Sequence, residues 1–379
     1  MADSTATRVR ALIESSGLTQ SAFAARAGLD ASKMSKSLSG VRRFTSLDLA
    51  HIAELGDVTV DWLLGGRAGP PAVAARAESV HDGGVEAGVR EATRLAQARE
   101  DLAFLGYEQA SGAVRSVDAP GLPADNGARL AAQVVGELRK AGGDPLARDL
   151  ASVVEHYFGI DVAVSMIPAG CDGLAWHDKH TRLILVATSE YPTRQRFTVA
   201  HELGHLLAGD DQGLSIDKDV MDPERRRHPS EATANAFAAA FLLPEDALRA
   251  AVPSDGGLSV DDFAALVMRL SVSPSTLAYR LHALGLIATP LREEFRTLTT
   301  AACAFRVGRS GEFADWIESS RRSRLPAALV RDTFTAYLDG KATLRPFANL
   351  VGVDVDILRR ALETPAEPGA GDPEPEFVP

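Results

Sequence analysis

RFTVAHELGH, residues 196–205, is an apolar segment that carries two histidines and one glutamate. Residues four apart lie on one face of a helix, so His201 and His205 can point at one ion with Glu202 one step around the helix. Zinc binds neutral imidazole nitrogens, and a catalytic zinc keeps one position for water beside a third protein ligand. Glu202 could take a proton from that water and pass it to a leaving amine. The pattern predicts a Zn2+ peptidase site rather than a solvated helix with two surface histidines.

The third ligand is expected downstream, at the start of a second helix over 230–243. Glu231 lies just before an apolar stripe that must face the interior, so its carboxylate can reach inward at the helix end. That stripe consists of Ala234, Phe237, Ala238 and Phe241. Competing ligands lie in the polar loop between the two helices and are interpreted more simply as solvated charges. They are Asp210, Asp211, Asp222, Glu224 and His228.

These two segments together resemble the ImmA/IrrE family of metallopeptidases. The resemblance rests on residues 196–205 and on the run Glu231-Ala-x-Ala-Asn-x-Phe-Ala, which ends at Leu243-Pro244. The paired segments are specific, whereas the two histidines and the glutamate alone would not be. The resemblance covers residues 128–288, including a β-hairpin that precedes the first helix.

The resemblance implies roles for particular residues. His201, His205 and Glu231 would hold the zinc ion, and Glu202 would be the catalytic base. Family members typically cleave a bacterial or phage repressor and so release its genes, which implies a repressor as the protein substrate. The strand at 173–177 is expected to be the edge with which an extended substrate pairs.

The apolar pattern predicts an α+β fold that is mainly helical and contains a short three-stranded sheet. Strands are expected over 160–167, 173–177 and 182–187, where residues alternate or form short apolar runs. Together with the resemblance, this predicts a zincin-like peptidase domain over 128–288. The expected helices of this domain lie at 128–141, 145–158, 192–208, 230–243, 259–271 and 274–284.

Residues 1–66 are interpreted as a separate helical unit, because apolar residues recur there at helical spacing. The run Leu18-Thr-Gln-Ser-x-x-Ala through Gly28-Leu, followed by residues 30–40, is similar to the lambda-repressor-like (XRE) helix-turn-helix. That resemblance implies DNA binding, with the second helix of the motif in the major groove. The expected N-caps of its second, third and fourth helices are Thr19, Asp30 and Ser46.

The second helix of this motif offers short polar and basic side chains to a groove, with further basic residues behind it for phosphates. Within residues 26–43, five basic residues face a single acid, Asp30, which is the local positive charge that DNA binding needs. The alternative is a protein–protein module with a solvated basic face. A single unit binds DNA weakly, so a homodimer formed through the C-terminal helices is expected. The candidate DNA contacts are Gln20, Ser32, Lys33, Ser35, Lys36, Arg42 and Arg43.

The remaining segments carry less information. Residues 67–127 are rich in glycine, proline and alanine and are interpreted as a linker with one helix at 88–106. Residues 289–363 are expected to be helical, without an assigned role. The acidic, proline-containing tail at 364–379 is expected to be disordered.

Composition limits the functions that remain. The formal net charge of -11 argues against DNA binding by the chain as a whole, so such binding must be local. Only two cysteines are present, Cys171 and Cys303, which argues against a disulfide framework and for the reducing cytoplasm. No run of 18 apolar residues and no apolar leader are found, so a membrane partner is not expected.

Two functions from different classes stay open. The first is a cytoplasmic regulator that joins a DNA-binding unit to a zinc metallo-endopeptidase. The second is a non-enzymatic transcriptional regulator or antitoxin whose zinc site is structural or sensory. The presence of Glu202 favours the enzyme, because a structural zinc site needs no base.

Overall fold

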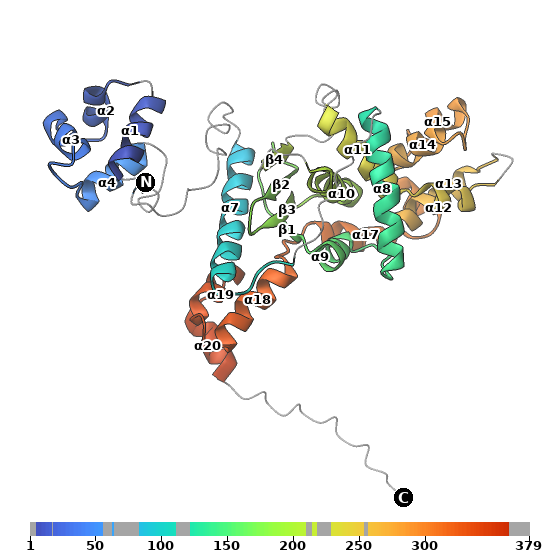
Figure 1. The fold of residues 1–379 in the computed structure, drawn as a ribbon. Coiled ribbons are helices and arrows are strands. Elements are labelled where there is room, and N and C mark those ends of the chain that lie inside the picture. Colours follow the sequence, from blue (N-terminus) through green and yellow to red (C-terminus); the bar gives the residue numbers. More distant parts are fainter. Residues whose placement is uncertain are drawn as a thin grey trace, which may run out of the picture. The chain divides into compact units, whose positions relative to one another are not determined.

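A computed structural model describes residues 5–16, 18–55, 63, 83–110, 122–209, 214–217, 229–253 and 257–363. The chain forms two compact units, Met1–His81 and Asp82–Pro379 (Figure 1). The tail at 364–379, expected to be disordered, lies outside the described residues. None of the helices in the described ranges is both long and apolar enough to cross a membrane.

Four described helices of the smaller unit surround one apolar core. They are α1 (Thr5–Ser15), α2 (Gln20–Arg26), α3 (Ala31–Leu38) and α4 (Ser46–Leu55). Val9, Met34 and Ile52 are fully buried and anchor α1, α3 and α4 to this core. Leu63 is buried in the same core.

Helix caps in this unit follow the sequence at two of three positions. Thr19 caps α2 and Asp30 caps α3, each by accepting a bond from a backbone N–H of the first turn. The prediction of Ser46 as the third cap is wrong by one residue. Thr45 accepts the backbone N–H of Asp48 at 3.1 Å, and the Asp48 carboxylate accepts the backbone N–H of Thr45 at 2.9 Å. This reciprocal arrangement satisfies two donors at once, so Thr45 is the favoured cap.

The larger unit is built on a four-stranded mixed sheet in the order β1-β3-β2-β4. Its strands are β1 (Asp161–Ser165), β2 (Gly173–His177), β3 (Arg182–Ala187) and β4 (Leu214–Asp217). β1 runs parallel to β3, whereas β2 is antiparallel to both β3 and β4. The α+β expectation is met, and β2 and β3 have their predicted bounds.

Strand β4 corrects two predictions. The sheet has four strands rather than three, and β2 is an inner strand rather than the edge at which a substrate could pair. β4 belongs to the segment that was interpreted as a polar loop. Four residues are too few for an alternating pattern to stand out, and pairing with β2, such as Ser215 opposite Ala175, is what makes them a strand.

Four helices build the core that carries the site. They are α8 (Pro123–Lys140), α9 (Leu150–Phe158), α10 (Pro192–Ala208) and α11 (Pro229–Leu242). α10 packs against β2 and β3, and α11 packs against both α8 and α10 (Figure 1). α8 begins at Pro123 rather than at residue 128, because proline fits the first turn of a helix, where its missing N–H has no partner to lose.

The chain after α11 continues as short helices within the same unit. α16 packs on α13, and α17 packs on α10, so the C-terminal region is joined to the rest of the larger unit. Its expected helical character over 289–363 is confirmed. These helices are α12 (Glu245–Ala251), α13 (Val260–Leu270), α14 (Pro274–Ala283), α15 (Thr289–Phe295), α16 (Thr300–Arg306), α17 (Ser310–Ser320), α18 (Ala327–Leu338), α19 (Leu344–Val351) and α20 (Val355–Glu363).

Helix α7 (Gly83–Phe104) changes the interpretation of residues 67–127 as a linker. It begins five residues before the predicted 88–106 and packs against β2, β3 and α18, on the side of the sheet away from α10 (Figure 1). The buried Arg99 bonds both carboxylate oxygens of Asp161 in β1 and reaches Asp332 in α18 at 2.7 Å. α7 is therefore part of the larger unit.

Candidate metal centre

Helix α10 carries the quoted motif into the interior. His201 and Glu202 are fully buried, and His205 is 3% exposed. The helix ends at Gly209, which has a φ of 72° and donates its N–H to the carbonyl of His205. This burial excludes the interpretation of a solvated helix with two surface histidines, and it requires partners for the polar groups that it encloses.

Gly204 brings the second helix close to the first. A Cβ at this position would lie 3.0 Å from the Phe237 ring and 3.2 Å from the Cα of Ala234, both on α11. Only a residue without a side chain allows this approach with its present geometry. The crossing places Glu231, in the first turn of α11, opposite the two histidines of α10.

The three side chains predicted as zinc ligands converge on one point. His201 Nε2 lies 3.0 Å from His205 Nε2 and 3.3 Å from Glu231 Oε2. His205 Nε2 lies 3.7 Å from Glu231 Oε1. With zinc–nitrogen bonds of about 2.0–2.1 Å, ligand atoms at the corners of a tetrahedron lie about 3.3–3.4 Å apart. The spacing and the donor types of these residues therefore fit a tetrahedral zinc ion.

Ser230 is a partner of this cluster that the sequence analysis missed. Its Oγ lies 3.3 Å from Nδ1 of His205, on the side of the ring away from the cluster. A histidine that binds metal through Nε2 commonly donates its Nδ1–H to such an oxygen, which holds the ring in place. The only signal in the sequence was its position directly before Glu231.

The carboxylate of Glu202 lies between α10 and the start of β2. A Cβ at Gly173 would lie 3.0 Å from Oε1 of Glu202 and 2.5 Å from Cγ2 of Thr198. Gly173 thus leaves the room that the Glu202 carboxylate occupies. The sequence analysis assigned no role to this glycine, because nothing in its neighbours marks the packing of β2 on α10.

Arg196, the first residue of the quoted stretch, anchors the start of α10. Its guanidinium donates to the carbonyls of Ala147 at 2.6 Å and Arg148 at 2.8 Å. Burial lowers the pKa of Arg196 to about 10, so the side chain is still protonated at neutral pH. These contacts fix the helix to the segment before α9, which no local pattern could predict.

The five alternative ligands lie in the chain between α10 and α11. All five of them lie in the segments 210–213 and 218–228, outside the described residues. Within the described part of the chain, His201, His205 and Glu231 are the group whose ligand atoms lie within 4.8 Å of one another.

In the smaller unit, six of the seven candidate DNA contacts are exposed. They are Gln20, Ser32, Lys33, Ser35, Lys36 and Arg43. Arg42 is different, because it forms an ion pair with Asp48 at 2.8 Å and donates to Ser37 Oγ at 3.2 Å. Its guanidinium holds the end of α3 to α4, which makes it the weakest candidate for a phosphate contact.

Comparison with known proteins connects this geometry to a family. Residues 156–282 match the family described as IrrE N-terminal-like domain, Peptidase_M78. The matched segment contains both histidines, Glu202 and Glu231, and it does not extend to the smaller unit. It supports a metallopeptidase domain of the IrrE and ImmA kind within the larger unit.

Three relatives are similar to the same part of the chain. The radiation response metalloprotease IrrE of Deinococcus radiodurans is 36% identical over 135 residues, which are 35% of this chain and 40% of the relative. IrrE of Deinococcus deserti is 34% identical over 35% of this chain and 47% of its own length. Metallopeptidase ImmA of Bacillus subtilis is 31% identical over 30% of this chain and 64% of its own length. The matches therefore cover less than two thirds of each relative.

Proposed function

We propose that the larger unit is a zinc-dependent endopeptidase. The observation that carries the proposal is the convergence of His201, His205 and Glu231 on one point, with the buried Glu202 next to His201 in α10. A purely structural zinc site has no need of a buried glutamate beside its ligands. The match of residues 156–282 to a peptidase family supports the same reading.

Each residue of the centre would have a defined part in peptide hydrolysis. Zinc, when held by His201, His205 and Glu231, supplies Lewis acidity that makes water a better nucleophile and polarises a carbonyl. Glu202 accepts a proton from the attacking water at its carboxylate and delivers it to the nitrogen of the leaving amine. Ser230 holds the ring of His205, and Gly173 keeps space for the Glu202 carboxylate.

The substrate would be a regulatory protein, a bacterial or phage repressor, cleaved so that its genes are released. This part of the proposal follows from the resemblance to the ImmA/IrrE family. An extended substrate segment would meet the sheet at β4 rather than at β2, because β4 occupies the outer side of β2.

The smaller unit would bind DNA and place the peptidase at a promoter. The exposed Lys33, Lys36 and Arg43 around α3 support this proposal, because they give a positive face to a motif similar to the XRE helix-turn-helix. Cytoplasmic regulators of this kind act as homodimers on paired half-sites, so dimerisation belongs to the same proposal.

A single pair of variants tests the enzymatic function. Glu202→Gln keeps the size of the side chain and removes the base, so zinc should remain while cleavage falls by about 100- to 10,000-fold. The control Glu190→Gln changes an exposed carboxylate that pairs with Arg321. It should leave the zinc content and the rate of cleavage unchanged. Proteins cut in cells are identified by mass spectrometry with each variant.

The same experiment separates the two classes of function. A non-enzymatic regulator would show identical protein fragments with the native chain and with Glu202→Gln, while removal of zinc would change its affinity for DNA. That result would replace the peptidase proposal with a sensory zinc site.

A further inference from the structure

Strand β2 borders the candidate base of the metal centre. Gly173 is its first residue, and a Cβ added there would lie 3.0 Å from Oε1 of Glu202. Neighbouring strands of a sheet lie about 4.7–4.9 Å apart. An extended peptide that pairs with β2 would therefore run one strand spacing from the strand that touches Glu202.

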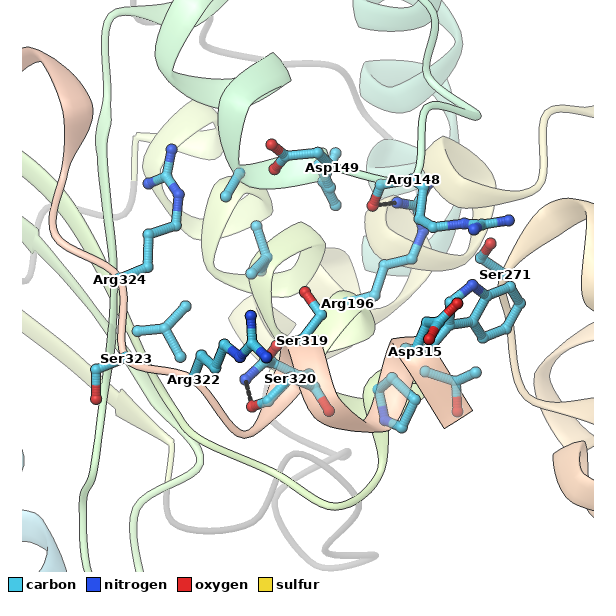
Figure 2. A pocket seen from close by; sticks show the side chains of 18 residues that line it. Arg148, Asp149, Arg196, Ser271, Asp315, Ser319, Ser320, Arg322, Ser323 and Arg324 are labelled. Carbon is cyan, nitrogen blue, oxygen red and sulfur yellow. Dashed lines mark hydrogen bonds between the residues drawn. The ribbon is translucent and has the colours of Figure 1, made fainter. Parts of the chain in front are cut away.

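The cavity shown in Figure 2 is separate from this approach. It has a volume of about 480 Å³ and lies at the first turns of α9 and α10, with α17 on its other side. Neither Glu202 nor any of the three proposed zinc ligands lines it, and its wall contains no residue of β2. A substrate bound in this cavity would not touch the centre, so the outer side of β2 is the better substrate position.

Both sides of β2 are already paired with strands of the same chain. β3 is antiparallel to it on one side and β4 on the other. The pairing with β4 runs from Gly173 opposite Asp217 to Trp176 opposite Leu214. Extended peptides add to a sheet through backbone hydrogen bonds at a free edge. Along these residues β4 takes the place beside β2 that such a peptide needs.

A peptide that meets the sheet in the described arrangement pairs beyond β4, because the sheet ends there within the described residues. It then lies two strand spacings from β2, which is about 9–10 Å. A general base acts across a hydrogen bond or through one water molecule. Pairing beyond β4 therefore leaves the peptide a full strand farther from Glu202 than pairing with β2.

We propose that β4 is an autoinhibitory strand, which occupies the place of an extended peptide substrate beside β2 and has to leave before cleavage. The proposal rests on the endopeptidase function proposed above and adds its regulation. β4 has only four residues, and a substrate strand replaces its backbone bonds with bonds of the same kind. β4 lies between His205 and Glu231 in the sequence, so it stays tethered to both ligand-bearing helices and can return.

This arrangement has a consequence for binding. Only the fraction of molecules in which β4 has left can bind a substrate beside β2, so the apparent dissociation constant is the intrinsic one divided by that fraction. Weakening β4 should therefore tighten peptide binding and lower KM. The value of kcat and the zinc content should not change, because neither depends on how often the place is free.

Proline substitutions in β4 test the proposal on the whole zinc-loaded chain. Successive N–H groups of a strand point to opposite edges, so Ser215→Pro and Asp217→Pro alter one edge and Ile216→Pro alters the other. Proline removes a ladder bond on the edge that faces β2 and is tolerated on the outward edge. One kind of variant is thus the matched control of the other, and the two substitutions at 215 and 217 should behave alike.

Binding is measured by fluorescence anisotropy in the Glu202→Gln background, so that a bound chain is not cut. The probes are a labelled peptide that copies residues 211–220 and labelled carboxymethylated casein, which is unfolded. We expect the variants altered toward β2 to bind both probes about fivefold more tightly than the parent, from the loss of one hydrogen bond. The variants altered on the outward edge should match the parent, and unlabelled peptide should displace casein.

Melting curves and metal analysis confirm the fold and the zinc content before affinities are compared. Equal affinities in all the chains, equal effects on both edges, or a peptide that does not displace casein would overturn the proposal. Cleavage of casein is then measured with Glu202 restored. Cleavage with a lower KM and an unchanged kcat supports both proposals. Tighter binding without any cleavage would mean that β4 covers a peptide-binding site and that the endopeptidase function is wrong.

Discussion

The two units hold their candidate functional side chains in opposite environments. In the larger unit, His201 and Glu202 are fully buried on a helix that packs against β2, β3, α8, α9, α11 and α17. In the smaller unit, Lys33, Lys36 and Arg43 are exposed. A metal centre depends on positions fixed by packing, whereas a DNA-binding face depends on the sum of nearby charges. Substitutions should therefore have abrupt effects in the first unit and graded effects in the second.

The largest expected effect is the loss of zinc from the buried centre. Purified native chain should hold about one zinc ion, and His201→Ala should hold almost none, because two remaining ligands do not close a tetrahedral site. Metal analysis of the purified protein gives the result directly. The control His177→Ala changes an exposed histidine at the end of β2 and should keep its zinc. If the double variant His201→Ala, His205→Ala retained all of its zinc, these residues would not form the metal site, and the contrast between the two units would fail.

The next effect tests whether α7 is part of the larger unit. Arg99→Ala should lower the free energy of unfolding of that unit by about 3–5 kcal/mol, because Asp161 would remain buried without its partner. Urea unfolding should show the loss in the larger unit and leave the smaller unit unchanged. Arg94→Ala breaks a partly exposed pair with Glu91 on the same helix and should cost at most about 1 kcal/mol. Equal effects of the two changes would make α7 an ordinary surface helix.

A smaller effect is expected where α10 and α11 cross. Gly204→Ala should destabilise the larger unit by about 1–3 kcal/mol and weaken zinc binding, because its methyl group meets Phe237 and the backbone of Ala234. The matched control is Gly136→Ala in α8, where no atom lies within 4 Å of the added methyl group. That change should stabilise the chain by about 0.5–1 kcal/mol through helix propensity. Stabilisation by both changes would show that the crossing tolerates a side chain.

The smallest effect is expected at the exposed basic face. Arg43→Ala should lower the slope of DNA affinity against salt concentration by about one and leave stability unchanged. Arg42→Ala should instead destabilise the smaller unit by about 1 kcal/mol, because this side chain binds Asp48 and Ser37. Salt titrations of DNA binding, together with melting curves, distinguish the two roles. An unaltered slope with Arg43→Ala would remove that residue from the interface.

Local patterns predicted the elements around the site well. The bounds of α10, β2 and β3 agree with the expectation, because each is set by short-range periodicity and by the turn around Asp178. Thr19 and Asp30 act as caps for the same reason, since a cap bonds only to the next turn. Ser46 failed as a cap because Thr45 and Asp48 form a better reciprocal pair.

Long-range contacts account for the predictions that failed. β4 is a strand only because β2 offers it backbone partners. The helix predicted at 88–106 was placed in a linker, because nothing local shows that its Arg99 reaches both β1 and α18. Arg196 is part of the quoted motif. The backbone carbonyls to which it donates lie before α9, about fifty residues away along the chain. No window of local sequence carries that information.

The sequence by itself determined the chemistry of the candidate centre: which side chains can bind zinc, which can act as a base, and that two ligands share a helix face. Those conclusions depend on residue type and on the fixed geometry of a helix. Only the tertiary structure decided that Glu231 reaches both histidines, through the close crossing at Gly204, and that β4 rather than β2 is the outer strand. It also decided that Arg43 stays exposed while Arg42 is held in an ion pair with Asp48. Such outcomes depend on which surfaces pack together, and packing is a property of the whole chain.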